Sequence, residues 1–514
     1  MASDANSTTD QGLRKNSLGL IECAVMSAAF MGPASVIFFS TSFNATFSGA
    51  AFPLSFLIAM IASLLIANTV AQFARKIASA GAFFSYTTAG LGATAGFLVG
   101  WMVVFAYAAF EPGAYGLFGS FISDVINDLA GVSIHWWIIA LATGALVTTL
   151  SMLGVLESLR AGLLFLIFEA CCILLIVGVI FANGASPNEL SLEPFNPHNS
   201  PTGWSGIFLG AIWGMFGFIG FEGATTLGEE TRMARKRIPL AVVGTVIVVG
   251  LFYVLTTYSE SVAFGTDAAG VKNLTESANP WVTIADHYLG TPGKILVYIA
   301  GTTGILGVWI AIHNAVTRVM YGMGRSGVLP RALAYTHPKY RTPWVAIAVE
   351  EVIAVTLVLW IGLSDGPLSV YGYLGVLGTI GVMFVYGFLA IGVGRMYWRD
   401  YRSEFNAFLH VILPVSSLGL IGVMLWKNVT ASTVHPYNLL PWIAAGYLLV
   451  GFGVAIYLNK RKPGVMTALA EEFSDHGSDD ADAAHEAPHP SPRVAPGRAG
   501  DNLALPNEQT GADL

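Results

Sequence analysis

Three glutamates stand inside long apolar stretches of this sequence, at Glu111, Glu169 and Glu222. No lysine or arginine lies near the centres of these stretches. An acid in such surroundings must be protonated, hydrated or paired with a mobile cation, and acids of this kind are usually functional. The structural alternative for each is a neutral carboxyl that is hydrogen-bonded to a backbone carbonyl.

The neighbours of two of these acids suggest their roles. Glu111 shares a helix face with Tyr107 and Tyr115, which lie four residues before and after it. We therefore expect Glu111 to line a cavity together with tyrosines. Glu169 lies at the centre of its stretch, and we expect it to hold a proton or Na⁺.

Other candidate residues carry weaker signals. For the adjacent pair Glu350 and Glu351 we expect a structural role or a contact between subunits, and for His313 the place of a satisfied core residue rather than a proton relay. The three cysteines show no metal-binding spacing, and the neighbours Cys171 and Cys172 are poorly placed to form a disulfide. We expect no metal site.

Two of the apolar stretches are interrupted by residues that disfavour a regular helix. Residues 30–35 read Phe-Met-Gly-Pro-Ala-Ser, and residues 216–222 read Phe-Gly-Phe-Ile-Gly-Phe-Glu. Proline lacks an N–H group, and glycine adopts unusual dihedral angles. Either interruption alone could be a packing kink. The two interrupted stretches are the first members of two sets of five stretches. Interruptions at matching positions of two such sets are typical of a transporter binding site.

The ends of the interrupted helices should carry opposite partial charges. After Pro33 the free N–H groups of Ala34, Ser35 and Val36 would form the positive end of a helix and attract a carboxylate. Near Phe216 the carbonyls of the other helix would form a negative end and attract an ammonium group. The two ends together predict a site for an amino acid zwitterion.

The composition indicates that membrane helices must position these residues. Of the 514 residues, 54% are hydrophobic and only 11% are charged, whereas soluble domains carry about 25% charged residues. This excludes a nucleic-acid-binding protein and a disulfide-stapled secreted module. Stretches of roughly 20 apolar residues predict spanning helices. The twelve expected spans are 18–42, 50–73, 93–122, 136–156, 158–181, 204–227, 240–264, 295–321, 343–363, 370–393, 405–426 and 440–458.

The basic residues predict how these helices are oriented. Twenty lysines and arginines fall on one side of the expected spans and three on the other, which places both termini in the cytoplasm and the protein in the cell membrane. We divide the chain into a cytoplasmic tail (1–17), a transmembrane domain (18–459) and a C-terminal tail (460–514). From Pro463 onward this tail carries ten acids and two arginines, and we expect it to be disordered.

Several motifs resemble those of the amino acid–polyamine–organocation permease family. The segment 217–222 followed by Glu229-Glu230 and Ile238-Pro239 resembles its Gly-Phe-Glu and Glu-Glu…Ile-Pro signature. Residues 80–83 and 324–330 resemble its second loop and the exit of its eighth span. The resemblance covers about residues 18–458 and implies a five-plus-five inverted repeat, discontinuous first and sixth helices, two added helices and alternating access.

The resemblance also implies roles for particular residues. Phe216 matches the family's gating aromatic residue, and Glu222 matches its proton-sensitive glutamate. Where the family commonly has Gly-Ser-Gly, this sequence has Gly32-Pro33-Ala34, which removes one N–H group and one hydroxyl that Ser35 could supply. The expected substrate site comprises Met31, Gly32, Pro33, Ala34, Ser35, Tyr107, Glu111, Phe216, Gly217, Ile219 and Gly220. Expected coupling and gating residues are Glu169, Phe216 and Glu222.

The predicted function is a secondary transporter that moves an amino acid or related amine, driven by cation symport, with H⁺ preferred over Na⁺. It needs no resident cofactor and no nucleic acid. The alternatives are an antiporter for cationic amino acids or polyamines and a membrane sensor that binds solute without moving it. An enzyme is not expected, because no H-E-x-x-H or G-x-S-x-G motif is present.

Overall fold

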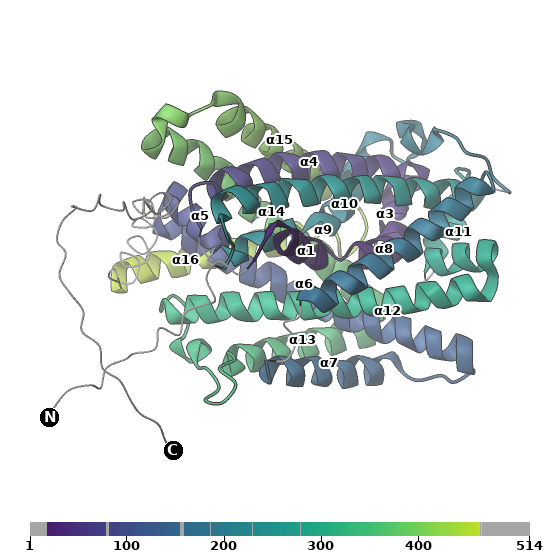
Figure 1. The fold of residues 1–514 in the computed structure, drawn as a ribbon, viewed down its shortest axis with the longest axis horizontal. Coiled ribbons are helices and arrows are strands. Elements are labelled where there is room, and N and C mark those ends of the chain that lie inside the picture. Colours follow the sequence, from purple (N-terminus) through teal and green to yellow (C-terminus); the bar gives the residue numbers. More distant parts are fainter. Residues whose placement is uncertain are drawn as a thin grey trace, which may run out of the picture.

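The fold consists of helices that lie alongside one another (Figure 1). The computed structural model describes residues 18–462, except 79–81, 155–158, 186, 229 and 278, together with residue 464. Both tails, and the motif residues Ala80, Gly81 and Glu229, lie wholly or largely outside the described residues. Eleven described helices are long and apolar enough to cross a membrane, and Trp136–Met152 is a shorter apolar helix. The twelve-helix membrane architecture expected from the sequence is thus confirmed.

The helices occupy most of the described chain. Their bounds are α1 (Leu20–Met31), α2 (Pro33–Phe39), α3 (Thr41–Ser48), α4 (Phe52–Ala74), α5 (Ala82–Leu91), α6 (Ala93–Ala130), α7 (Trp136–Met152), α8 (Leu159–Ala182), α9 (Trp204–Phe218), α10 (Ala234–Phe264), α11 (Ala268–Glu276), α12 (Pro280–Arg325), α13 (Trp344–Asp365), α14 (Pro367–Asp400), α15 (Leu413–Ala431) and α16 (Leu440–Arg461). A π-helix (Phe408–Ile412) precedes α15. The short 3₁₀ helices are Gly49–Ala51, Glu193–Phe195, Pro197–Asn199, η4 (Phe221–Leu227), Arg331–Ala334 and Arg402–Glu404.

Several helices differ in length from the expected spans. The helix α12 begins at Pro280, not at residue 295, and changes direction at Gly290, which has φ 64° and ψ −158°. The helices α5 and α11 were not expected, because each is too short to resemble a spanning stretch. Hydropathy detects the membrane-crossing part of a helix, and it underestimates the parts that extend beyond the lipid.

The first span is broken at one residue. The helix α1 ends at Met31, and Gly32 adopts the left-handed conformation with φ 57° and ψ 60°. Pro33 then opens α2, where its missing N–H group costs no helical hydrogen bond. A side chain at Gly32 would collide with Val308 of α12, so this position needs glycine for its conformation and for its close packing.

The sixth span is broken more extensively. The helix α9 ends at Phe218, Ile219 is extended, and Gly220 has φ 110°. The remainder is the 3₁₀ helix η4, not the continuation of an α-helix. Ser27 of α1 binds this segment, since its hydroxyl donates to the Phe221 carbonyl at 2.6 Å and accepts from the Ala224 N–H at 3.0 Å.

The helix contacts occur in pairs that match two sets of five helices. The helix α4 packs against α9, and its counterpart α10 packs against α1. Likewise α6 packs against α14, and α12 packs against α8. The counterparts α4 and α10, α6 and α12, and α7 and α13 also contact each other. This pattern is compatible with an inverted repeat, in which the two broken helices lie at the centre.

Candidate functional site

The two helix breaks contact each other at the centre of the protein. A Cβ atom on Gly220 would lie 2.7 Å from the carbonyl carbon of Phe30 and 2.8 Å from the backbone nitrogen of Met31. Real Cβ atoms do not approach backbone so closely, so glycine at this position allows the sixth span to lie against the first. The sequence placed the breaks at matching positions, and the tertiary structure brings them together.

A cavity opens beside these breaks. It has an empty volume of about 560 Å³, part of which is open to solvent. Its lining residues come from α1, α2, α6, α9 and the break after it, α12 and α14. They are Phe30, Met31, Ser35, Val36, Phe110, Ala114, Leu117, Phe216, Ile219, Ile305, Val308, Ile312 and Tyr371. None of these side chains is charged.

Ser35 supplies a free polar group in this otherwise apolar cavity. Its side chain is 6% exposed, and its hydroxyl has no hydrogen-bond partner among the described residues. The first hydrogen bond of α2 runs from the Val36 N–H to the Gly32 carbonyl at 3.1 Å. The expectation of a free N–H group at Val36 is therefore wrong, because the break at Gly32 is short enough for that carbonyl to reach Val36.

The carbonyls expected at the end of α9 already have donors. The Phe216 carbonyl accepts from the Ile219 N–H at 3.2 Å, and the Gly217 carbonyl accepts from the Tyr253 hydroxyl at 2.8 Å. Protein groups thus satisfy much of this break before any ligand binds. The expectation that both carbonyls stay exposed for an ammonium group is corrected here, because Tyr253 of α10 reaches the break.

Phe216 lies in an aromatic wall of the cavity. Its ring centroid is 5.3 Å from that of Phe110 and 5.4 Å from that of Tyr371. The hydroxyl of Tyr371 in α14 lies 2.6 Å from the hydroxyl of Ser40, the residue that follows α2. This contact links α14 to the end of α2. Phe216 therefore forms one aromatic side of the cavity together with Phe110 and Tyr371, and its gating role stays a prediction.

Glu222 holds the second break together and does not line the cavity. Its carboxylate accepts from the Gly220 N–H at 3.0 Å, from the Tyr107 hydroxyl at 3.0 Å and from the Tyr386 hydroxyl at 3.4 Å. The structure therefore brings together three residues that the sequence placed at the site. Tyr107 reaches the break through Glu222, and not through a shared cavity with Glu111.

Glu169 approaches the cavity beside Ser35. A Cβ atom on Gly304 of α12 would lie 3.2 Å from the Ser35 hydroxyl oxygen and 3.4 Å from Oε2 of Glu169. Both side chains therefore border the same narrow gap, which exists because residue 304 has no side chain. Glu169 itself is 5% exposed.

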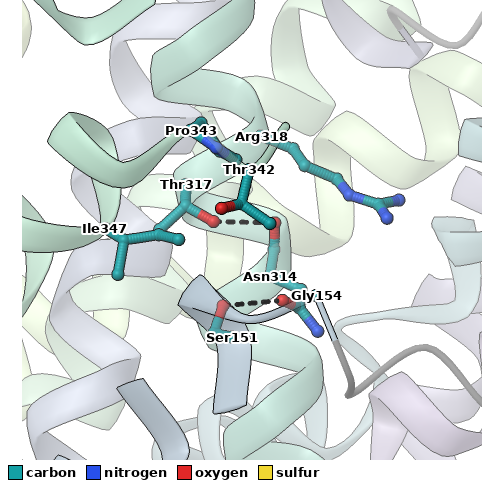
Figure 2. Close-up of a pocket in the computed structure, with 8 residues that line it drawn as sticks. All are labelled: Ser151, Gly154, Asn314, Thr317, Arg318, Thr342, Pro343 and Ile347. Atoms are coloured by element: carbon teal, nitrogen blue, oxygen red, sulfur yellow. Dashed lines mark hydrogen bonds between the residues drawn. The ribbon is translucent and has the colours of Figure 1, made fainter. Parts of the chain in front are cut away.

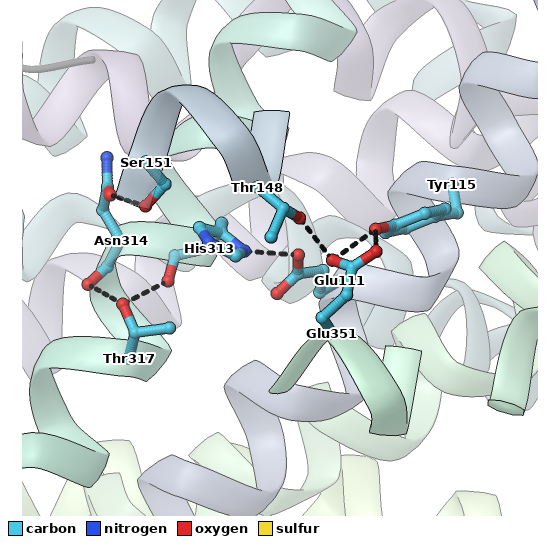
Figure 3. A network of polar contacts seen from close by, with 8 residues as sticks. All are labelled: Glu111, Tyr115, Thr148, Ser151, His313, Asn314, Thr317 and Glu351. Carbon is cyan, nitrogen blue, oxygen red and sulfur yellow. Dashed lines mark hydrogen bonds and ion pairs between the residues drawn. The ribbon is translucent and has the colours of Figure 1, made fainter. Parts of the chain in front are cut away.

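Glu111 of α6 does not line the cavity, although its neighbour Phe110 does. Its carboxyl contacts His313 of α12, and the Tyr115 hydroxyl contacts Glu351 of α13 (Figure 3). Glu350 is fully buried inside the protein, so it is not available for the subunit contact that the sequence suggested. Among the described residues, no group of three His, Cys, Asp or Glu side chains could hold a metal ion.

The predicted and observed cavity residues overlap in part. Met31, Ser35, Phe216 and Ile219 line the cavity, whereas Gly32, Pro33, Ala34, Gly217 and Gly220 form the adjoining backbone without lining it. The apolar wall that α6 and α12 contribute to the cavity was not predicted from the sequence. A faint signal existed, since Phe110, Ala114 and Leu117 follow the spacing of one helix face, but every core helix shows such spacing.

The chain matches known transporters over most of its length. Residues 25–462 match the family model described as amino acid permease. The low-affinity putrescine importer PlaP of Escherichia coli (strain K12) is 25% identical over 448 residues, covering 84% of this chain and 93% of that protein. The branched-chain amino acid permease BcaP of Bacillus subtilis (strain 168) is 27% identical over 368 residues, covering 66% and 73%.

Another relative is an exchanger. The serine/threonine exchanger SteT of Bacillus subtilis (strain 168) is 24% identical over 422 residues, which cover 80% of this chain and 90% of that protein. These relatives are transporters and not enzymes. With two contacting helix breaks beside a central cavity, this chain is a multi-pass membrane transporter of amino acids or amines and belongs to the amino acid permease family.

Proposed function

We propose that this chain imports an α-amino acid with an apolar side chain across the plasma membrane, by alternating access and in symport with H⁺. The central cavity carries this proposal, because its lining combines apolar walls with one unpartnered hydroxyl. An apolar side chain would lose no hydrogen bond on entering it. A charged side chain would be desolvated without a partner among the lining residues.

The polar end of the substrate is assigned to the first break. Ser35 can donate its hydroxyl to a carboxylate oxygen, and the N–H groups of Ala34 and Ser35 precede the first hydrogen bond of α2. The Ser35 hydroxyl thus replaces the serine hydroxyl that is missing here, because this chain has Pro33 where the family commonly has serine.

The coupling proton is assigned to Glu169. A charged Glu169 would repel a carboxylate held at Ser35, because both side chains border the gap at Gly304. A protonated Glu169 would not, so proton binding would favour substrate binding. Glu222 has a second role in this proposal: its protonation would weaken the hydrogen bond from Gly220 and loosen the break.

The loops that carry the basic residues are assigned to the cytoplasm, together with both termini. Import then requires the cavity to open alternately to the outside and to this basic side. Twelve helices with both ends on one side are compatible with the apolar helices found.

Uptake by proteoliposomes tests the proposal directly. Purified protein should accumulate leucine or phenylalanine when the outside is made acidic, and a Na⁺ gradient should have no effect. A one-unit pH difference should drive about tenfold accumulation if one proton accompanies each substrate. Indifference to both gradients would overturn symport and favour exchange, and binding without uptake would favour a sensor.

Putrescine is the second candidate substrate, because the importer PlaP is a relative along 84% of this chain. Competition decides between the two. Leucine should inhibit uptake and putrescine should not, and the reverse result would assign the Glu169 carboxyl to an ammonium group of the substrate.

A further inference from the structure

A second group of buried polar residues lies on α6, α12 and α13, outside the lining of the central cavity. Glu111 of α6, His313 of α12 and Glu350 of α13 are each fully buried. We call these three residues the carboxyl cluster. Nδ1 of His313 lies 2.7 Å from Oε1 of Glu111 (Figure 3). Three helices that are distant in the sequence thus bring two acids and one imidazole together.

The two acids of the cluster contact each other. The Glu350 carboxyl is within hydrogen-bonding contact of Glu111. Among the described residues, no N–H or O–H group donates to either oxygen of Glu350 or to Oε2 of Glu111. Two carboxylates in contact repel each other, and a hydrogen bond between carboxyls requires a proton on one of them. The complete burial of both acids, the lack of a donor to Glu350 among the described residues and the contact with Glu111 together indicate a proton that the two carboxyls share.

The neighbouring acid Glu351 is already engaged by two hydroxyls. The Tyr115 hydroxyl of α6 lies 2.7 Å from both oxygens of Glu351, and Thr148 of α7 donates to the same carboxyl. Glu351 therefore has the donors that a carboxylate needs. Ser151 of α7 contacts Asn314, and Arg318 of α12 lines the same pocket as Asn314. The proton shared by the two cluster acids is thus the one that can leave with the least rearrangement.

A pocket with Arg318 in its lining lies between α7, α12 and the start of α13 (Figure 2). Its lining includes Asn314, which follows His313, and Ile347, which lies three residues before Glu350. It also includes Ser151, whose hydroxyl oxygen is 3.4 Å from Oδ1 of Asn314. On α13 the pocket residue Ile347 is slightly less than one helical turn of about 5.4 Å from Glu350, and on α12 the pocket begins at the residue that follows His313.

The cluster is also one residue away from the cavity on two helices. Glu111 follows the cavity residue Phe110, and His313 follows the cavity residue Ile312. Along α12 the cluster lies between Gly304, where Glu169 approaches, and the pocket residues 314–318. A proton that moves from the level of Glu169 toward the basic side would pass this position.

We propose that the carboxyl cluster is a second proton-binding site, through which H⁺ leaves toward the basic side during each transport cycle; this role rests on the proposed H⁺ symport. The O–H bond between the shared proton and Glu350 breaks, and the proton joins a water molecule of the pocket to form hydronium. Glu111 and Glu350 are then both ionised. Their repulsion pushes α6 away from α13 and shifts Phe110 and Ala114 in the cavity wall.

The substitution Glu350→Gln tests this proposal in proteoliposomes. The glutamine amide can donate a hydrogen bond to Glu111, but it cannot release a proton. The variant therefore imitates the permanently protonated state of the two acids. We expect leucine accumulation driven by a pH gradient to fall from about tenfold to none. Exchange of internal for external leucine without a gradient should stay within about twofold of wild type, because exchange needs no proton release. Glu111→Gln should behave in the same way.

Glu260→Gln is the matched control. Glu260 is also fully buried, but both of its oxygens have donors, Thr41 at 2.7 Å and Trp281 at 3.1 Å. This variant should keep gradient-driven accumulation, which shows that loss of a buried acid is not by itself the cause. Accumulation that survives in Glu350→Gln and in Glu111→Gln would overturn the proposal.

Infrared spectroscopy separates this proposal from the proposed function. The carbonyl stretch of a protonated carboxyl should be present in the wild-type protein at neutral pH, and it should weaken in Glu350→Gln. An unchanged band in that variant would overturn the shared proton. If wild-type uptake did not depend on the pH gradient, the proposed symport would be wrong. The infrared band would still show whether the cluster holds a proton.

Discussion

Two faces of α6 have opposite chemistry, although their residues are neighbours in the sequence. Phe110 and Ala114 line an apolar cavity, whereas Glu111 and Tyr115 lie among acids, hydroxyls and an imidazole. Successive helical residues point about 100° apart, so one helix can separate the two environments. The difference shows how one helix can border a substrate cavity on one face and a proton-binding cluster on another. Movement of that helix can then couple substrate binding to proton binding.

The helix α12 repeats this division. Its residues Ile305, Val308 and Ile312 face the cavity, and His313 faces the carboxyl cluster. The helices α6 and α12 are counterparts in the two sets of five, and they pack against each other. Any substitution that disturbs one face and leaves the other intact therefore tests whether the two environments are separate.

Gly220→Ala should have the largest effect, because it removes the contact on which the cavity depends. At φ 110° an alanine is strained, and its Cβ atom would collide with the Phe30 backbone. We expect a loss of about 2 kcal/mol or more in stability, with uptake abolished. Thermal unfolding and leucine uptake measure this. Gly307→Ala in α12, whose new Cβ would meet no atom within 4 Å, is the control and should keep both.

Glu222→Gln should have the next largest effect, and it tests whether the break or the carboxyl cluster sets the pH response. The glutamine would lose one of the charged hydrogen bonds from Gly220, Tyr107 and Tyr386, each worth about 1.5–3 kcal/mol. We expect transport to fall and its pH dependence to change, with a smaller effect on thermal unfolding. An unchanged pH profile would remove Glu222 from coupling and leave that role to Glu169 and the cluster.

Ala114→Val should narrow the cavity without touching the cluster. The added methyl groups would reduce the space for a large apolar side chain, and a misfit of one methylene costs about 1–3 kcal/mol. We expect the KM for leucine to rise about tenfold, with the KM for alanine nearly unchanged. An equal effect on both amino acids would mean that the substrate side chain does not contact this wall.

Ser35→Ala should have the smallest effect, and it acts on the polar end of the cavity. The hydroxyl has no partner in the protein, so its loss should leave the thermal stability unchanged. Loss of one hydrogen bond to a substrate carboxylate would weaken binding by about 1–2 kcal/mol. A thermal-shift titration with leucine measures the change in Kd. Unchanged affinity would move the carboxylate away from α2.

Local features of the sequence predicted much of the fold. The breaks near Gly32 and Gly220 were predictable because proline and glycine change the backbone wherever they occur in a helix. The pairing of Glu111 with His313 was not predictable, because 202 residues separate them and nothing local to either indicates the other. For the same reason the sequence could not show that Tyr107 reaches Glu222 rather than the cavity.

By itself the sequence determined a chain of apolar helices, two of them interrupted, with acids near the centres of several. These properties follow from hydropathy and backbone chemistry, which act over a few residues. Only the tertiary structure decided which acid faces which partner and which helix face lines the cavity. The reason is geometric: a rotation of about 100° separates neighbouring side chains on a helix, so the packing of helices distant in sequence decides their surroundings.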